Sequence, residues 1–342
     1  MSQIRYDRLR DAHVIIAPER LHRPDCDIQI KERRREKKVC PFCEGNEAMT
    51  PPEIFAKRSF ESFANEKGWQ TRVVPNLYKA LQIETPHEHH FGHFEHWEGF
   101  GAHEVIIDTP QHHTSMSQWS EANVIAWLQT LRSRVADLRR DHRIAYISLF
   151  KNQGEAAGST QEHSHTQLIG LPLIPKAQKE EYKNAYIHYK HHKRSLFEEL
   201  LAHEEKEAIR MVDSEGDFSA YCPYASAYPF EVVLSSKKAL GQIDRLSDAS
   251  IKELAPLLLR VLKKLKVQLS CLDFNLALFT PPLQESGFES ELFASVDEVY
   301  RFSIRIMPRI YKFGGFEGST GIIINPVAPE QAAKLLRESS HV

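Results

Sequence analysis

A succession of one strand, one helix and two further strands occurs twice along this chain, and this repetition limits the folds that are open to it. In the first half, the apolar stretch at 104–107 precedes a helical pattern over 120–138. In the second half, the stretch at 231–234 precedes a helical pattern over 247–269. Several elements that recur in the same order indicate an internal duplication.

The strands after each helix complete the repeated unit. The pattern at 274–279 corresponds to 144–150, and 300–307 corresponds to the strand that begins near His163. The first helix has Ser120 as its expected N-cap and apolar side chains at helical spacing, at Val124, Trp127, Leu128, Leu131, Val135 and Leu138. The sequence therefore predicts an α+β fold in which helices flank antiparallel sheets, with units at 1–175 and 176–342.

The two repeats differ in the residues that could carry chemistry. His112 stands eight residues after Glu104, whereas Ala239 stands eight residues after Glu231. The strand near residue 300 also lacks the His-x-His pattern of its counterpart. We expect the first unit to hold the reactive groups and the second unit to serve as scaffold and binding wall.

Those reactive groups are concentrated in the segment 152–167, which joins two apolar strands through a glycine-containing loop. Side chains alternate between the faces of a strand, so His163, His165 and Gln167 are expected on one face. The Gly158-Ser159-Thr160 backbone amides and hydroxyls could bind an anion as a nest. Two imidazoles and an amide beside such a loop favour phosphate chemistry, although a strand with surface hydrogen bonds is a simpler alternative.

A histidine is well suited to such chemistry, because neutral imidazole is nucleophilic near pH 7 and its phosphoryl adduct can be passed on. Gln167 can donate or accept hydrogen bonds but cannot act as an acid or base. A glutamine at the third position of this face therefore favours transfer of a nucleotidyl group over hydrolysis.

Cys40 and Cys43 form a Cys-x-x-Cys pair, the spacing at which two thiolates can bind one zinc ion. Tetrahedral zinc needs two more ligands, and His112 and His163 are candidates. A redox motif has no supporting thioredoxin-like βαβ context here. A turn with two buried cysteines remains the plain structural alternative.

Composition excludes several other functions. The chain carries 44 basic and 46 acidic side chains, which gives no general attraction to nucleic acid or to an anionic membrane. No apolar run is long enough to span a membrane, and we expect a cytoplasmic protein. The charged run at 31–38 is expected to be solvated, and the histidine-rich segment at 87–96 is expected to be a flexible surface loop.

In combination, these motifs resemble one known family. Cys40-Pro-Phe-Cys43, Asn152 with the loop that follows it, His163-Ser-His165-Thr-Gln167 and the duplicated units are similar to the galactose-1-phosphate uridylyltransferase family of the histidine-triad superfamily. The tail Gly314-Gly-Phe-Glu317 looks like that of the ADP-glucose phosphorylase branch. The resemblance covers nearly the whole chain and implies a duplicated histidine-triad-like half-barrel.

The resemblance also implies roles for individual residues. His165 would be the nucleophile that forms a nucleotidyl-imidazole, and Gln167 would bind phosphoryl oxygens. One zinc ion per subunit would be bound by Cys40, Cys43, His112 and His163. Substrate contacts would fall on Arg20, Arg23, Asn76, Asn152, Gly158, Ser159, Thr160 and Gln161, and on a sugar-binding loop of Lys312, Phe313, Gly314, Gly315, Phe316 and Glu317. In the family this loop reaches the partner's active site, which implies a homodimer.

The chain departs from the family at its additional metal sites. The histidines of a second site are missing from the strand at 300–305, and 200–240 offers no match to the second zinc site of the plant branch. We therefore expect a single metal ion and transfer of a nucleoside monophosphate from a nucleotide-sugar to a hexose 1-phosphate. Inorganic phosphate as acceptor, a nucleotide or dinucleoside-polyphosphate hydrolase, and a non-catalytic zinc-stabilised protein are the alternatives.

Overall fold

The computed structural model describes residues 1–22, 39–58, 61–112, 115–283 and 294–339, and the fold is built on one ten-stranded sheet. Every neighbouring pair of strands in this sheet is antiparallel. From edge to edge the strands are β10 (Met211–Glu215), β11 (Phe218–Tyr221), β12 (Val232–Ser236), β14 (Ser303–Pro308), β13 (Phe274–Phe279), β8 (Tyr146–Gln153), β9 (His165–Leu171), β7 (Ala102–Ile107), β4 (Trp69–Pro75) and β3 (Phe55–Arg58).

The strand order makes the predicted duplication visible. Strands β7, β9 and β8 of the first repeat are mirrored by β12, β14 and β13 of the second, and the repeats join where β8 pairs with β13. Phe150 of β8 lies opposite Ala277 of β13. An approximate two-fold axis passes through this pair, so both repeats share one hydrogen-bonded sheet.

The sequence comparison paired Glu104 with Glu231, and the structure shows that this alignment of the two repeats is wrong by one residue. Glu104 lies on the face covered by helix, where its carboxylate pairs with Arg134 of α1 (Glu121–Leu138). Glu231 lies on the opposite face, because Val232 beside it belongs to the helix-covered core. Since successive side chains alternate, Glu104 corresponds to Val232, and His103 corresponds to Glu231.

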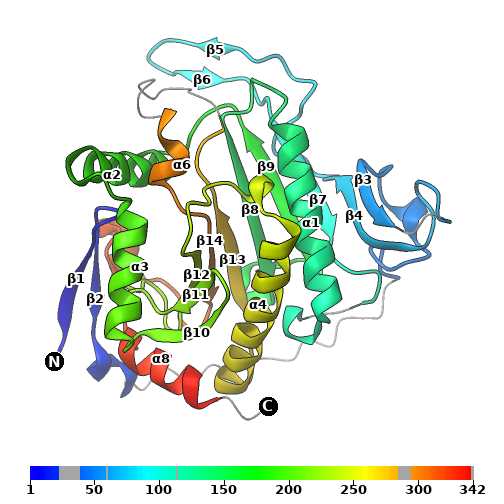
Figure 1. Ribbon diagram of the computed structural model, residues 1–342. Coiled ribbons are helices and arrows are strands. Elements are labelled where there is room, and N and C mark those ends of the chain that lie inside the picture. The colour runs from blue at the N-terminus through cyan, green and yellow to red at the C-terminus, as the bar shows by residue number, and fades with distance from the viewer. Residues whose placement is uncertain (23–38, 59–60, 113–114, 284–293, 340–342) are drawn as a thin grey trace.

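Two long helices cover one face of the sheet, α1 and α4 (Asp248–Leu269) (Figure 1). Each begins where a serine hydroxyl accepts a hydrogen bond from the third helical amide, Ser120 from Asn123 and Ser247 from Ser250. The predicted N-cap of the first helix is thereby confirmed. The apolar side of both helices packs on the sheet, and Trp127 at its centre is fully buried.

Shorter elements complete the molecule. Helices α2 (Lys176–His192), α3 (Leu196–Glu207) and α6 (Val296–Val299) lie together in Figure 1, near the small sheet of β1 (Gln3–Asp7), β2 (Ala12–Ile16) and β15 (Ile323–Asn325). The remaining elements are α7 (Gly315–Thr320), α8 (Pro329–Glu338), the hairpin strands β5 (His89–His90) and β6 (His96–Trp97), and the 3₁₀ turns η1 (Pro18–His22), η2 (Glu47–Met49), η3 (Met116–Gln118), η4 (Glu155–Ala157) and η5 (Ile243–Arg245). Among the described helices, none combines the length and apolarity needed to cross a bilayer.

The open face of the second repeat is covered by the chain itself. Val233 and Arg305 of this face line a cavity of about 410 Å³ together with residues of β1 and α3, among them Tyr6 and Leu200. Arg305 is held there by an ion pair with Glu231 at 2.8 Å. The corresponding face of the first repeat carries the predicted site residues.

Glu330 at the start of α8 connects the two ends of the chain. Its carboxylate accepts hydrogen bonds from Arg5 of β1 at 2.9 and 3.2 Å, and from Arg210 at 3.0 Å. Burial raises the pKa of Glu330, but the hydrogen bonds from Arg5, from its own backbone amide and from Arg210 outweigh this and hold the pKa below its usual value. A depressed carboxyl pKa stabilises the fold above the pKa of the unfolded chain, and this contribution is lost as the pH falls through the folded pKa.

We therefore expect Glu330→Gln to lower the free energy of unfolding by about 1 kcal/mol at pH 7. The difference from wild type should shrink as the pH falls below the ordinary carboxyl pKa of about 4.3 and disappear below the lower pKa of the folded protein, where the wild-type carboxyl is protonated in both states. Urea unfolding at pH 7 and at about pH 3, below the ordinary carboxyl pKa, measures both values. An equal difference at the two pH values would contradict this assignment.

Candidate active site and metal centre

The two histidines of the predicted motif are fixed in different ways, although both are buried on the same face. The Nε2 atom of His163 lies 2.8 Å from the carbonyl oxygen of Thr109 and donates to it, which leaves Nδ1 with a free lone pair. For His165 the arrangement is reversed. Its Nδ1 donates to the carbonyl oxygen of His163 at 2.9 Å, which leaves Nε2 with the free lone pair.

A buried ion pair lies beneath this strand, on the face toward α1. The Lys151 ammonium donates to Asp108 at 2.6 Å, to the Ser164 hydroxyl at 2.7 Å and to the carbonyl oxygen of His165 at 3.1 Å. The other carboxylate oxygen of Asp108 accepts from Thr166 at 2.8 Å. The pair therefore fixes the backbone on both sides of His165.

Lys151 also acts on His165 through its charge. Burial lowers the pKa of His165, and the positive charge of Lys151 lowers it further. The imidazole is therefore kept neutral, the state in which it can attack an electrophile.

Four side chains meet at the other end of the site. The ligand atoms of Cys40, Cys43, His112 and His163 all lie within 4.8 Å of one another. The Nδ1 atom of His163 lies 3.6 Å from each cysteine sulfur, and Nδ1 of His112 lies 3.3 Å from the sulfur of Cys43. Two thiols and two imidazoles with their lone pairs turned inward form a donor set that fits a tetrahedral metal ion.

The acid-base properties of these groups also fit a cation. Burial and the neighbouring Cys40 raise the pKa of Cys43 to about 11, and burial lowers the pKa of His163 to about 4. The protein alone thus keeps the imidazole neutral but disfavours a thiolate. A bound metal ion would reverse the second effect, because its charge stabilises the thiolate.

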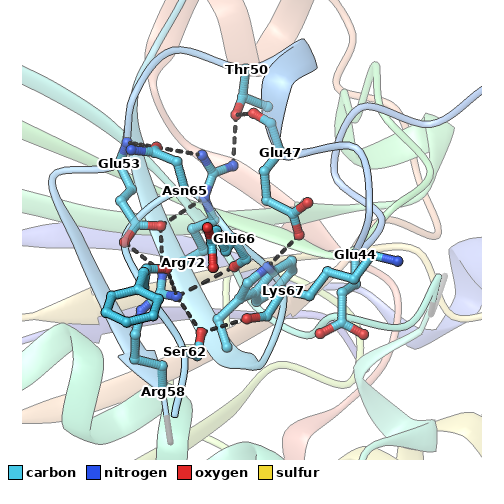
Figure 2. A network of polar contacts seen from close by, with 12 residues as sticks. Glu44, Glu47, Thr50, Glu53, Arg58, Ser62, Asn65, Glu66, Lys67 and Arg72 are labelled. Atoms are coloured by element: carbon cyan, nitrogen blue, oxygen red, sulfur yellow. Dashed lines mark hydrogen bonds and ion pairs between the residues drawn. The ribbon is translucent and has the colours of Figure 1, made fainter. Parts of the chain in front are cut away.

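The loop that carries the cysteines is held by the polar network shown in Figure 2. The Glu47 carboxylate accepts from the Trp69 indole at 2.8 Å and from the Gly45 amide at 3.0 Å. Arg72 of β4 is buried and bonds to Glu53 at 3.0 Å and to Thr50 at 2.6 Å. These contacts tie the loop to the edge of the sheet beside β7 and thereby place the sulfurs near His163.

His103 was not identified from the sequence, yet it determines how Gln167 is presented. Its Nδ1 accepts from the Ala80 amide at 3.0 Å, so its Nε2 carries the proton and donates to Oε1 of Gln167 at 3.1 Å. His103 therefore bonds to the side-chain oxygen of Gln167 and not to its NH₂ group. Asn76 lies beside them, with its Nδ2 3.0 Å from Nε2 of His103 and its Oδ1 accepting from the Tyr78 amide.

The loop after Asn152 differs from the predicted anion nest. The Gly158 amide donates to Glu155 and the Ser159 amide to Gly154, while the Ser159 hydroxyl donates to the carbonyl of Gln161. These donors are satisfied within the loop, so they do not form a nest for an external anion. Gly154 has φ +85°, and a β-carbon there would lie 1.9 Å from the Asp273 carboxylate. This close approach explains the glycine.

The other residues predicted to contact substrate lie in several different parts of the fold. Asn152 accepts from Asn275 of β13 at 2.8 Å, at the junction of the repeats. Arg20 is exposed in η1, and Arg23 lies outside the described residues. In the described part of the chain, no hydrogen bond, ion pair or ring contact joins the segment 312–317 to His165 or Gln167. Phe313 of that segment contacts Tyr228 and is 43% exposed.

A duplicated antiparallel unit with a neutral, oriented histidine beside a Cys₂His₂ cluster defines an enzyme fold of the histidine-triad superfamily. A family model described as the N-terminal domain of galactose-1-phosphate uridyl transferase matches residues 1–175. ADP-glucose phosphorylase of Arabidopsis thaliana is 31% identical, over 99% of this chain and 93% of its own length. The chain belongs to the galactose-1-phosphate uridylyltransferase family, as the sequence motifs predicted.

Other relatives agree with this assignment. The galactose-1-phosphate uridylyltransferase of Thermotoga maritima is 25% identical, over 99% of both chains. The crystal structure of the Arabidopsis thaliana ADP-glucose phosphorylase with bound ADP-glucose has a TM-score of 0.81 at 27% identity, and covers 99% of both chains. A uridylyltransferase structure with a TM-score of 0.74 shares 21% identity and shows the same fold.

The buried pair of Lys151 and Asp108 beneath β9 should have a measurable effect on stability. Lys151→Met leaves the Asp108 carboxylate buried without a counter-charge, and we expect it to cost about 3–5 kcal/mol of unfolding free energy. The double variant Asp108→Asn, Lys151→Met removes both charges and should recover most of this loss. Denaturant unfolding measures both, with the exposed Lys176→Met as control. A double variant no more stable than Lys151→Met would contradict this role of the pair.

Proposed function

We propose that this protein transfers a nucleoside monophosphate from a nucleotide-sugar to a hexose 1-phosphate by a ping-pong route through His165. Nε2 of His165 attacks the α-phosphorus, so that a P–N bond forms while the bond to the sugar 1-phosphate oxygen breaks. The second acceptor's phosphate oxygen then attacks the same phosphorus and releases the imidazole. The observation that carries this proposal is the hydrogen bond from Nδ1 of His165 to its own strand, which presents Nε2 as a neutral nucleophile.

Gln167 completes the reacting face in this proposal. Because His103 occupies its oxygen, its NH₂ group can donate to a non-bridging phosphoryl oxygen. A neutral amide cannot activate water as a base, which supports transfer over the alternative of a nucleotide or dinucleoside-polyphosphate hydrolase.

The acceptor has a specific alternative. Inorganic phosphate in place of a hexose 1-phosphate would make the reaction an ADP-sugar phosphorolysis. The 31% identity to a plant ADP-glucose phosphorylase over almost the whole chain favours this alternative. The uridylyltransferase relatives favour the hexose 1-phosphate. The nucleotide base would be adenine for the phosphorylase and uracil for the uridylyltransferase.

Zinc is the metal we propose for Cys40, Cys43, His112 and His163, at one ion per subunit. Thiolate and imidazole ligands suit this ion, and a full set of four protein ligands is typical of a structural site. When bound, zinc would hold the thiolates and His163 in place. His163 itself orients His165, because its backbone carbonyl accepts the Nδ1 proton.

The substrate would extend away from His165 in both directions. We assign phosphate contacts to Arg20 and Arg23, and nucleotide contacts to Asn76, Asn152 and the loop at 158–161. We assign the sugar to Lys312, Phe313, Gly314, Gly315, Phe316 and Glu317 of a second subunit in a cytoplasmic homodimer. Residues 312–316 are exposed, which leaves this segment accessible to a second subunit. A monomer mass in sedimentation equilibrium at micromolar protein would contradict the dimer.

The covalent route predicts a labelled intermediate. Incubation with UDP-glucose or ADP-glucose that is radiolabelled in the α-phosphate should leave acid-labile, base-stable label on the protein. His165→Ala should abolish the label and lower turnover by on the order of 10⁴-fold, because its effect is on a covalent step. His142→Ala removes an exposed histidine outside the site and should label like wild type.

The same labelled protein identifies the acceptor. Release of the label by galactose 1-phosphate or glucose 1-phosphate as nucleotide-sugar supports uridylyl transfer, and release by inorganic phosphate as nucleoside diphosphate supports the phosphorylase. Release by water alone at a comparable rate would show a hydrolase. Label retained in His165→Ala would refute the nucleophile.

Zinc content provides an independent test of the metal centre. Protein purified without chelators should contain one tightly bound zinc ion per chain by plasma mass spectrometry. Cys43→Ser removes a thiolate and should weaken zinc binding roughly tenfold or more, with a lower thermal midpoint. Cys271→Ser changes an exposed cysteine elsewhere and should keep its zinc. Wild-type protein without stoichiometric metal would contradict the proposal.

A further inference from the structure

The histidine-rich segment that the sequence assigned to a flexible loop is a two-stranded hairpin. His89 of β5 pairs with Trp97 of β6, and His90 pairs with His96. One step further, the Glu98 amide donates to the carbonyl of Glu88. The hairpin extends beyond the end of the main sheet, away from β3 and from α8 (Figure 1). Its strands are too short for the alternation of polar and apolar residues to reveal them in the sequence.

One face of the hairpin is aromatic and anchors it. The ring of His89 stacks on Trp97 with centroids 4.1 Å apart and planes at 12°. His87 contacts both Trp97 and Phe100, and Phe100 is completely buried in the main core. These contacts hold the hairpin to the domain and fix which side chains are on its other face.

The other face gathers four potential metal ligands. Because side chains alternate, the cross-strand pairs His90–His96 and Glu88–Glu98 lie side by side on it. Nε2 of His90 lies 3.2 Å from a carboxylate oxygen of Glu98 and 3.8 Å from one of Glu88. Nε2 of His96 lies 4.0 Å from Glu98, and the two imidazole rings stack 4.6 Å apart.

These separations are close to those of ligands that share one ion. Donor atoms about 2.0–2.2 Å from a common metal lie roughly 3–4 Å from each other in a tetrahedral arrangement. The ligand atoms of His90, His96 and Glu98 all fall within 4.8 Å of one another. In the described part of the chain, neither Glu88 nor Glu98 forms an ion pair with a lysine or arginine, so the imidazoles are their ion-pair partners.

We propose that this face of the hairpin binds a divalent transition-metal ion, distinct from the ion of the Cys₂His₂ cluster. Two imidazoles with one or two carboxylates favour Zn²⁺, Ni²⁺ or Cu²⁺ over Mg²⁺ or Ca²⁺, which prefer oxygen ligands alone. The ligands are largely exposed, so a coordination position stays open to solvent and the site is weaker than the thiolate site. The ion would cross-link β5 and β6 and stabilise the hairpin against opening.

Calorimetric titration of the zinc-loaded protein with NiCl₂ tests this proposal. We expect one additional binding event per chain with unchanged zinc content afterwards. The double variant His90→Gln, His96→Gln should weaken this event at least tenfold, and Glu98→Gln should weaken it severalfold. Titration with MgCl₂ should give no comparable event.

The matched control is His191→Gln, His192→Gln, which removes two exposed histidines from α2 and should leave the event unchanged. Circular dichroism and nucleotidyl labelling of His165 should be the same in all variants, since the hairpin lies outside the site. Nickel binding that is unchanged in His90→Gln, His96→Gln would overturn the proposal. So would an equal loss in the α2 variant, because nickel would then bind histidines unspecifically.

Discussion

The buried ion pair between Lys151 and Asp108 fixes the strand that carries His165. Lys151 comes from β8 and Asp108 follows β7, so the pair joins the two strands that flank β9. Lys151 also donates to Ser164 and to the carbonyl oxygen of His165, and Asp108 also accepts from Thr166. Burial of the two charges is costly, and it is offset only because each is fully paired. This requirement makes the backbone around His165 rigid.

The rigid strand allows two neighbouring histidines to take opposite roles. His163 directs Nδ1 toward the cysteines, and His165 directs Nε2 away from its own backbone. The roles are set by which carbonyl each ring can reach, Thr109 for the first and His163 for the second. Loss of order in the Cys₂His₂ cluster would therefore reach His165 through a single group, the backbone carbonyl of His163.

Much of this arrangement could be predicted from the sequence. The alternation His163, Ser164, His165, Thr166, Gln167 was sufficient to place the two histidines and the glutamine on one face, and the serine before each long helix was sufficient to place its start. The spacing of Cys40 and Cys43 indicated a metal pair, which the structure joins to both predicted histidines. These features depend on the spacing of residues that are close in the chain, and this spacing can be read directly from the sequence.

The features that were missed depend on contacts between distant segments. The repeats were aligned one residue out of register, because pairing similar residues ignores which face each one occupies. His103 belongs to a plain strand pattern, and its importance comes from the Ala80 amide and Gln167 on either side of it. A lysine directly after the apolar run 144–150 was the available signal for the buried pair. The inward-turned amides of Gly158 and Ser159 follow from loop geometry that the residue types leave open.

The duplicated sheet has a consequence for how changes in this chain act. His103 and Gln167 are joined by a neutral hydrogen bond, and the matching positions of the other repeat hold the ion pair of Glu231 and Arg305. This face of the first repeat thus carries neutral hydrogen-bonding groups. The same face of the second repeat carries an ion pair, and β1 and α3 cover it. The second repeat therefore supports the fold of the first repeat. Substitutions around Arg305 should therefore reduce the amount of folded enzyme, whereas those around Gln167 should alter what each folded molecule can do.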